Sequence, residues 1–218
     1  ALGAAIHPHY GVFSPLRGEY LELLAQAPLP ASDLAFDIGT GSGCMATSIS
    51  LALADKHCHT EAWDISEDAL RIATDNAAHL GADVKFRRRD ALRLEEDFPA
   101  EENLGGAEAL SDTNAAASWD IIVSNPPYID EYDPHLAQGD VRFEPLSALV
   151  AANAGLADLE HIVTTSREHL LPGGWLLVEH GWTQGEGVRA LFTQAGYAAV
   201  ETCRDYGGNE RLTLGQWL

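Results

Sequence analysis

The segment Leu34-Ala-Phe-Asp37-Ile-Gly39-Thr40-Gly41-Ser42-Gly43 carries the strongest structural signal in this chain. A short apolar run ends beside an acidic residue, and a glycine-rich turn follows before a segment of helical period begins. Glycine lets the backbone turn sharply and approach a ligand closely. In an open parallel sheet such a turn lies beyond the carboxyl ends of the strands, where ligands bind. The segment therefore predicts a strand, a ligand-binding turn and a helix of an α/β protein.

Short apolar runs alternate with longer segments of helical period along the chain, which is the pattern of a parallel sheet covered by helices. The expected strands are Leu34–Asp37, Thr60–Asp64, Val84–Arg88, Trp119–Val123, Trp175–Glu179, Ala198–Cys203 and Arg211–Leu214. The expected helices are Arg17–Gln26, Gly43–Ala54, Ser66–Leu80, Leu156–Leu170 and Gln184–Ala195. The third helix has the clearest ends, because Ser66 is a typical N-cap and Gly81 a typical C-terminal stop.

Composition limits the classes of protein to which the chain can belong. With 218 residues, 46% of them apolar, it is long enough for one α/β domain with a real core. Thirteen Lys and Arg against 33 Asp and Glu leave a net charge of −20, which disfavours unaided binding to nucleic acid or to anionic membranes. No apolar run approaches the ~18 residues of a membrane span, and the first ten residues do not resemble a signal peptide. We therefore predict a cytoplasmic protein without a membrane partner.

Three local features have plain structural interpretations. The segment from Glu95 to Ser118 contains seven acids and no Lys or Arg, so we expect a flexible acidic insertion. His57-Cys58-His59 cannot all face one ion from a regular element, so no metal site is predicted. Lys85 and Arg87 to Arg89 alternate faces of a strand, and are expected to pair with acids.

The glycine turn has the pattern G-x-G-x-G, whereas a dinucleotide fingerprint needs glycine at the position of Cys44. This variant suits S-adenosylmethionine, which has no pyrophosphate but carries an amino-acid tail and a ribose. Asp64 and Asp90 end the next two strands, where they could accept from the ribose hydroxyls and the adenine amine respectively. Each acid alone could equally be a helix cap or a solvated residue. The candidate cofactor residues are Asp37, Gly39, Thr40, Gly41, Ser42, Gly43, Asp64 and Asp90.

The most specific motif is Asn125-Pro126-Pro127-Tyr128, which directly follows an expected strand. Two prolines fix φ and remove two backbone donors, so they predict a rigid turn. A proline turn plugged by an aromatic ring is the structural alternative. The side-chain oxygen of Asn125 and the carbonyl of Pro126 can accept the N–H groups of a planar amide or amine, while Tyr128 stacks on its face. These four residues are therefore the candidate catalytic group.

From Trp119 to the C-terminus the chain resembles the bacterial peptide chain release factor glutamine methyltransferases. The resemblance rests on N-P-P-Y-I-D from Asn125, on V-R-F-E-P-L-S-A-L from Val141, on L-P-G-G-W-L-L-V-E-H-G from Leu171, and on C-R-D-Y-G-G-N-E-R from Cys203. N-P-P-Y alone is shared with adenine-N6 and cytosine-N4 methyltransferases.

The resemblance implies a Rossmann-like class I methyltransferase fold, with a seven-stranded, mostly parallel sheet, an antiparallel last strand and helices on both faces. It implies methyl transfer from S-adenosylmethionine to N5 of the glutamine in the Gly-Gly-Gln motif of release factors, and it adds Ala91 and Asn125 to the cofactor residues. Residues 1–30 are expected to form an arm or the remnant of a helical domain, and 31–218 the catalytic domain. Two alternatives stay open: a nucleic-acid amino-methyltransferase, and a cofactor-binding subunit without turnover.

Overall fold

The computed structural model describes residues 33–54, 58–90, 119–139 and 141–218. Seven strands form one sheet in the order β3-β2-β1-β4-β5-β7-β6. The strands are Leu34–Ile38 (β1), His59–Asp64 (β2), Val84–Arg88 (β3), Trp119–Ser124 (β4), Leu170–Glu179 (β5), Ala198–Arg204 (β6) and Glu210–Gln216 (β7). Neighbouring strands from β3 to β5 pair in parallel, and β7 pairs antiparallel with both β5 and β6. The order of the strands reverses at β1, beside β4, as in doubly wound folds.

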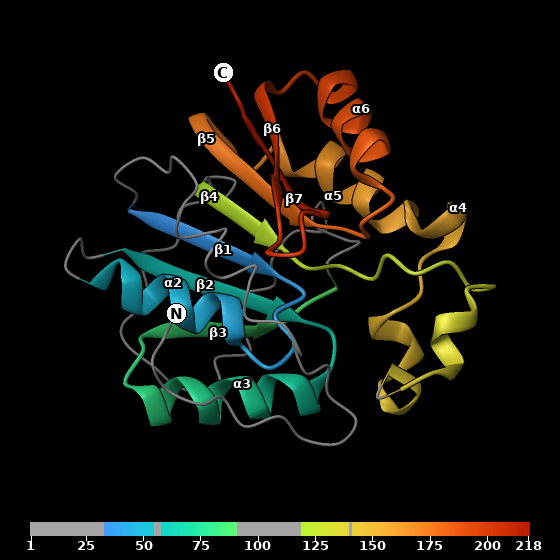
Figure 1. Cartoon of the computed structure of the whole chain (residues 1–218). Helices are drawn as coiled ribbons and strands as arrows, with labels where there is room; N and C mark the ends of the chain where they lie inside the picture. Colours follow the sequence, from blue (N-terminus) through green and yellow to red (C-terminus); the bar gives the residue numbers. More distant parts are fainter. Residues whose placement is uncertain (1–32, 55–57, 91–118, 140) are drawn as a thin grey trace.

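Helices lie on both faces of the sheet (Figure 1). The helices are Cys44–Ala52 (α2), Glu67–Leu80 (α3), Ala152–Gly155 (α4), Ala157–Ser166 (α5) and Gly185–Ala195 (α6). Successive residues of a strand point to opposite faces. Thus Ile121 and Val123 of β4 pack into a core cluster with α2, while Ile122 packs into another with α5 and α6. Both faces of the central strands are buried, which explains why these strands are almost wholly apolar.

The seven-stranded, mostly parallel sheet with an antiparallel last strand confirms the predicted fold class. The predicted ends of the third helix are also confirmed, because the Ser66 side chain accepts from the Ala69 N–H and Gly81 adopts φ 71°. The basic cluster pairs with acids as expected, through Arg87 with Glu61 and Arg88 with Glu67. The predicted helix Arg17–Gln26, the arm 1–30 and the insertion from Glu95 to Ser118 lie outside the described residues.

Two neighbouring boundary predictions were wrong, the end of one helix and the start of the next strand. The helix predicted over Leu156–Leu170 is α5, which ends at Ser166, and β5 begins at Leu170 rather than at Trp175. The His169 carbonyl accepts from the Trp119 N–H, so the chain is already paired with β4 at this point. Gly174 allows the close approach, since a Cβ there would lie 3.0 Å from the Trp119 carbonyl oxygen. The sequence pattern did not predict this extension of the strand, because residues 172–174 are Pro and Gly, which are unfavourable inside strands.

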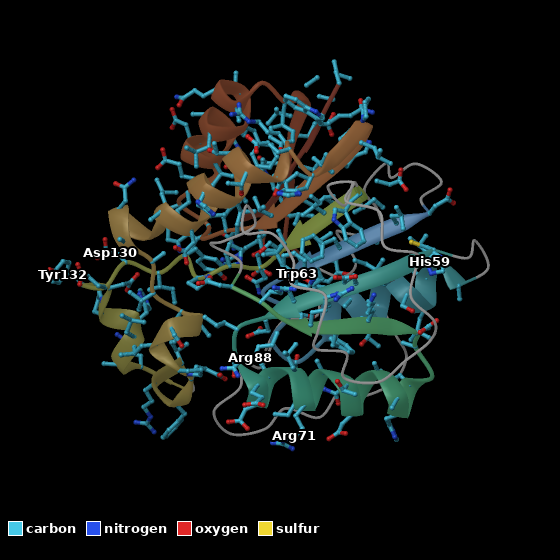
Figure 2. The ribbon with its side chains drawn as sticks, turned by 180° about the vertical axis from the view of Figure 1, so that it is seen from behind. His59, Trp63, Arg71, Arg88, Asp130 and Tyr132 are labelled. Atoms are coloured by element: carbon cyan, nitrogen blue, oxygen red, sulfur yellow. The ribbon has the colours of Figure 1, made fainter. Side chains whose placement is uncertain are left out.

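The chain from Asn125 to Ala151 crosses the carboxyl edge of the sheet, beyond the arrowheads in Figure 1. It contains three short 3-10 turns, Pro134–Ala137 (η3), Val141–Phe143 (η4) and Leu146–Ala148 (η5), and leads into α4. Figure 2 shows Tyr132 of this segment projecting outward at the end of the molecule opposite to His59, at the start of β2. Among the described residues, no helix has the length and apolar character to cross a membrane.

Candidate active site

The glycine turn leaves β1 at the point where β1 lies between β2 and β4. Beneath it, Asp37 is fully buried, and its Oδ2 accepts from the Thr40 hydroxyl at 2.7 Å and from the Ala46 N–H at 3.1 Å. Its Oδ1 has no hydrogen-bond partner among the residues that the structure describes. Burial raises the pKa of Asp37 to about 7, although the bonds from Thr40 and Ala46 oppose the shift. Asp37 therefore links the glycine turn to the start of α2 through Thr40 and Ala46.

Asp64, at the end of β2, ties the glycine turn to the neighbouring strand. Its Oδ2 accepts from the Gly41 N–H at 2.8 Å, and its Oδ1 accepts from the Ser66 N–H at 2.8 Å. Each carboxylate oxygen has two lone pairs, so each can accept a further donor. Burial raises the pKa of Asp64, and the backbone N–H groups of Ser66 and Gly41 counteract the shift. The structure thus gives Asp64 a role in shaping the turn that the sequence pattern did not reveal.

Asp90 is half-buried two residues beyond the end of β3, at the same edge of the sheet. It lies close enough to Asp158, on α5, for their like charges to interact. The pKa of Asp158 is raised by burial, while His161 lowers it and Asp90 raises it further. The acids predicted at successive strand ends, Asp37, Asp64 and Asp90, therefore share one edge. Ala91 lies outside the described residues.

The Asn125–Tyr128 turn begins beside the glycine turn. In the parallel register Ser124 of β4 is opposite Ile38 of β1, so Asn125 and Gly39 follow at neighbouring positions. The Ser124 hydroxyl donates to the Ile38 carbonyl at 2.8 Å and links the two strand ends. Pro126 is buried, whereas Asn125 is half-buried. The structure thus brings the two sequence-predicted groups to adjacent strand ends.

Tyr128 forms a side-chain hydrogen bond with β5, the strand next to β4 in the sheet. Its hydroxyl donates to Glu179 Oε1 at 3.2 Å, at the end of β5. The next residue, Ile129, donates from its N–H to Leu149 and accepts from Ala151, so the chain after the turn is paired as an isolated bridge. Tyr128 therefore has a fixed position at the carboxyl edge.

Sequence reasoning missed two polar residues at this edge, Glu179 and Gln184. Glu179 ends β5, so the rule that located Asp64 and Asp90 could have located it too. Gln184 contacts the turn through the backbone of Tyr128, at a separation of 56 residues. Only the tertiary structure reveals that contact.

The chain is similar in sequence to proteins named release factor glutamine methyltransferase. It is 47% identical over 196 residues to the protein of Salmonella typhimurium LT2, covering 90% of this chain and 63% of the relative. It is 50% identical over 181 residues to that of Escherichia coli K12, covering 83% and 58% respectively. The chain thus spans about three fifths of the length of these relatives. No protein-family model matches it.

Solved structures agree on the fold. A methyltransferase from Pyrococcus furiosus superposes with a TM-score of 0.63 at 16% identity, covering 98% of this chain and 88% of that one. A ribosomal protein L11 methylase from Lactobacillus delbrueckii superposes with a TM-score of 0.56 at 16% identity, over 91% and 78% of the two chains. At such identities the likeness shows a Rossmann-like methyltransferase fold and nothing finer. The chain thus has a methyltransferase fold, and its sequence is similar to about three fifths of the length of proteins named release factor glutamine methyltransferase.

Proposed function

We propose that this chain transfers the methyl group of S-adenosylmethionine to the side-chain amide nitrogen of the glutamine in the Gly-Gly-Gln motif of release factors. The observation that carries the proposal is the register of β1 and β4, which places Asn125 beside Gly39. Sequence similarity of 47–50% identity supports the choice of a protein glutamine as the target, because the relatives are named for that reaction.

The residues around the glycine turn fit S-adenosylmethionine. Gly39, Gly41 and Gly43 have φ of 70°, 54° and 78°, a backbone that leaves no side chain over the turn. Asp37 provides a buried carboxyl group beneath it whose Oδ1 has no partner in the described part of the chain, and which is suited to attract the ligand's ammonium group. Asp64 retains lone pairs for ribose hydroxyls, and Asp90 is placed for the adenine amine. When bound, the cofactor supplies an electrophilic methyl group on a sulfonium.

The Asn125–Tyr128 turn would activate the target nitrogen. An amide nitrogen is a poor nucleophile because its lone pair is delocalised into the carbonyl. Asn125 Oδ1 and the Pro126 carbonyl would each accept one N–H and localise that lone pair. The Tyr128 ring would support the flat face of the amide and keep the nitrogen in line with the methyl. After transfer the nitrogen carries an excess proton, which it loses to water.

Substitution of Asn125 tests this proposal. We expect Asn125→Ala to lower the rate of methylation by about a hundredfold or more, because one of two polar contacts to the reacting amide is lost. The measurement is transfer of tritium from S-adenosylmethionine to a full-length release factor. Gln138→Ala, at an exposed position beyond the turn, is the control and should retain the wild-type rate. Absence of labelling by the wild-type chain, or labelling of DNA or RNA instead, would contradict the proposed substrate.

The protein substrate would dock on the carboxyl edge of the sheet. Among the described residues, most of the large hydrophobic side chains that are exposed surround this edge: Ile65, Tyr132, Phe143, Leu146, Trp182 and Tyr206. Ile65 follows β2, Trp182 follows β5, and Tyr206 is in the turn between β6 and β7. An apolar rim around a polar site is typical of a surface that a protein partner covers.

A further inference from the structure

Gln184 joins three separate segments of the chain at the candidate active site. It immediately precedes α6, and its side chain is half-buried. Its Oε1 accepts from the Gly181 N–H at 2.8 Å, while its Nε2 donates to the Tyr128 carbonyl at 3.0 Å and to the Ala154 carbonyl at 3.2 Å. A single side chain thereby links the exit of β5, the Asn125–Tyr128 turn and α4.

Only a primary amide satisfies this arrangement. The Gly181 N–H needs an acceptor, and the Tyr128 and Ala154 carbonyls need donors. A glutamine amide offers one oxygen and two N–H groups, so every bond is matched. A glutamate of the same size would place a carboxylate oxygen against two carbonyl oxygens and lose both donors. The chemistry of the three backbone groups thus selects glutamine over its closest isostere.

Glycine residues next to Gln184 allow the three segments to approach one another closely. A Cβ on Gly155, which has φ 80°, would overlap the Tyr128 carbonyl oxygen and would lie 2.8 Å from Gln184 Nε2. A Cβ on Gly181 would lie 2.9 Å from Gln184 Oε1. The contact with the Tyr128 backbone requires glycine at position 155. At position 181 a side chain would instead crowd the Gln184 amide itself and push it away from its partners.

The contacts of Gln184 help to fix the position of Tyr128. Its carbonyl is held by Gln184, and its hydroxyl by Glu179, so the residue is fixed at both ends. Loss of the bond from Gln184 would leave the peptide plane between Tyr128 and Ile129 held on one side only, by the Ile129 N–H that donates to Leu149. A shift of about 1 Å at a reacting group can cost a hundredfold in rate.

We propose that Gln184 is a positioning residue that sets the geometry of the Asn125–Tyr128 turn for methyl transfer. The inference rests on the proposed function for its kinetic consequence, but the positioning itself is a structural claim that can be measured without turnover. Gln184 acts through the backbone of Tyr128 and touches neither Asp37 nor Asp64, so cofactor affinity should not depend on it.

The experiment compares Gln184→Glu and Gln184→Leu with two controls. Gln194→Glu makes the same chemical change at an exposed position of α6. Val188→Ala removes core packing from the fully buried Val188 of α6 and lowers stability without touching the turn. We expect both Gln184 variants to lose about tenfold to a hundredfold in kcat for a release factor. Their KM and their affinity for S-adenosylhomocysteine should stay within about twofold of wild type. Both controls should keep the wild-type kcat at a temperature well below their melting points.

Hydrogen exchange gives a readout that needs no activity. Backbone amides from Tyr128 to Tyr132 should exchange faster in Gln184→Leu than in wild type, and should be unaffected in Val188→Ala. Wild-type kcat in both Gln184 variants, or a loss of kcat that merely follows melting temperature as in Val188→Ala, would overturn the inference. If the wild-type chain does not label release factor while exchange at the turn still responds to Gln184, the proposed function fails and the positioning role stands.

Discussion

The Asp37 carboxyl group both accepts hydrogen bonds that fix the glycine turn and has a raised pKa. Its Oδ2 fixes the glycine turn through Thr40 and Ala46, which requires a buried acceptor. Burial also raises its pKa to about 7, so the carboxyl group takes up a proton near neutral pH. Because the pKa is higher in the folded protein than the ordinary value of 3.8, this group favours folding at low pH, and the benefit is lost as the pH rises from about 4 to 7. Ionisation of Asp37 therefore costs stability in the unliganded protein.

The ionisation of Asp37 should also make the affinity for the cofactor depend on pH. A cationic amino group is attracted to ionised Asp37 and not to the neutral acid, so binding must displace the proton at low pH. With a pKa of about 7, we expect the affinity for S-adenosylhomocysteine to fall by up to about tenfold between pH 8 and pH 6. Asp37→Asn should bind more weakly at pH 8 and lack this dependence. Calorimetric titration at both pH values measures it, and equal wild-type affinities would contradict the role given to Asp37.

At the scale of the elements, α2 and α3 meet where α2 begins. A Cβ on Gly43 would lie 2.8 Å from the Ala73 Cβ of α3, and Gly43 has φ 78°. Gly39 has a similar φ of 70°, but no atom of the residues that the structure describes lies within 4 Å of its Cβ position. The two glycines thus differ in packing while they share the same backbone conformation.

This difference in packing predicts that alanine substitutions of Gly39 and Gly43 lower the free energy of unfolding by different amounts. Gly39→Ala should lower the free energy of unfolding by about 1–2 kcal/mol, the cost of a left-handed conformation. Gly43→Ala should lower it by about 2–4 kcal/mol, because overpacking against Ala73 is added. Urea denaturation of both variants measures the two costs. Equal losses would mean that α3 moves away freely and that the contact does not constrain the turn.

The elements that were predicted correctly are those whose signals are local. β1 and β4 are mostly apolar and are buried on both faces, and α3 has a cap at each end, so residue type alone indicates them. The acids at the strand ends follow from the topology of a parallel sheet. In contrast, α4 contains Asn153 and Ala154 with φ of 55° and 54°, which no propensity indicates. The start of β5 and the bonds of Gln184 depend on contacts between segments that are distant in the sequence. The spacing of residues along a single sequence does not predict such contacts.

Net charge and exposed apolar surface are distributed differently over the protein. The net charge of −20 is a property of the entire chain. The large exposed hydrophobic side chains are instead concentrated around the carboxyl edge of the sheet, where the glycine turn and the Asn125–Tyr128 turn emerge. Leu171, near the start of β5, lies at the opposite edge and is 36% exposed, so it serves as a comparison. The exposed hydrophobic side chains and the candidate site therefore lie at the same edge of the sheet.

Removal of rim side chains should weaken docking without altering the chemistry. Trp182 and Tyr206 are 62% and 74% exposed, so their substitution disturbs little of the core. We expect Trp182→Ala and Tyr206→Ser each to raise the KM for a full-length release factor by about tenfold, as for a residue worth about 1–2 kcal/mol at an interface, with kcat unchanged. Leu171→Ser should leave both constants at their wild-type values. Steady-state kinetics with tritiated S-adenosylmethionine separates the two constants. A fall in kcat at constant KM would place Trp182 or Tyr206 in the chemical step instead, and an equal rise in KM for Leu171→Ser would mean that docking is not confined to this edge.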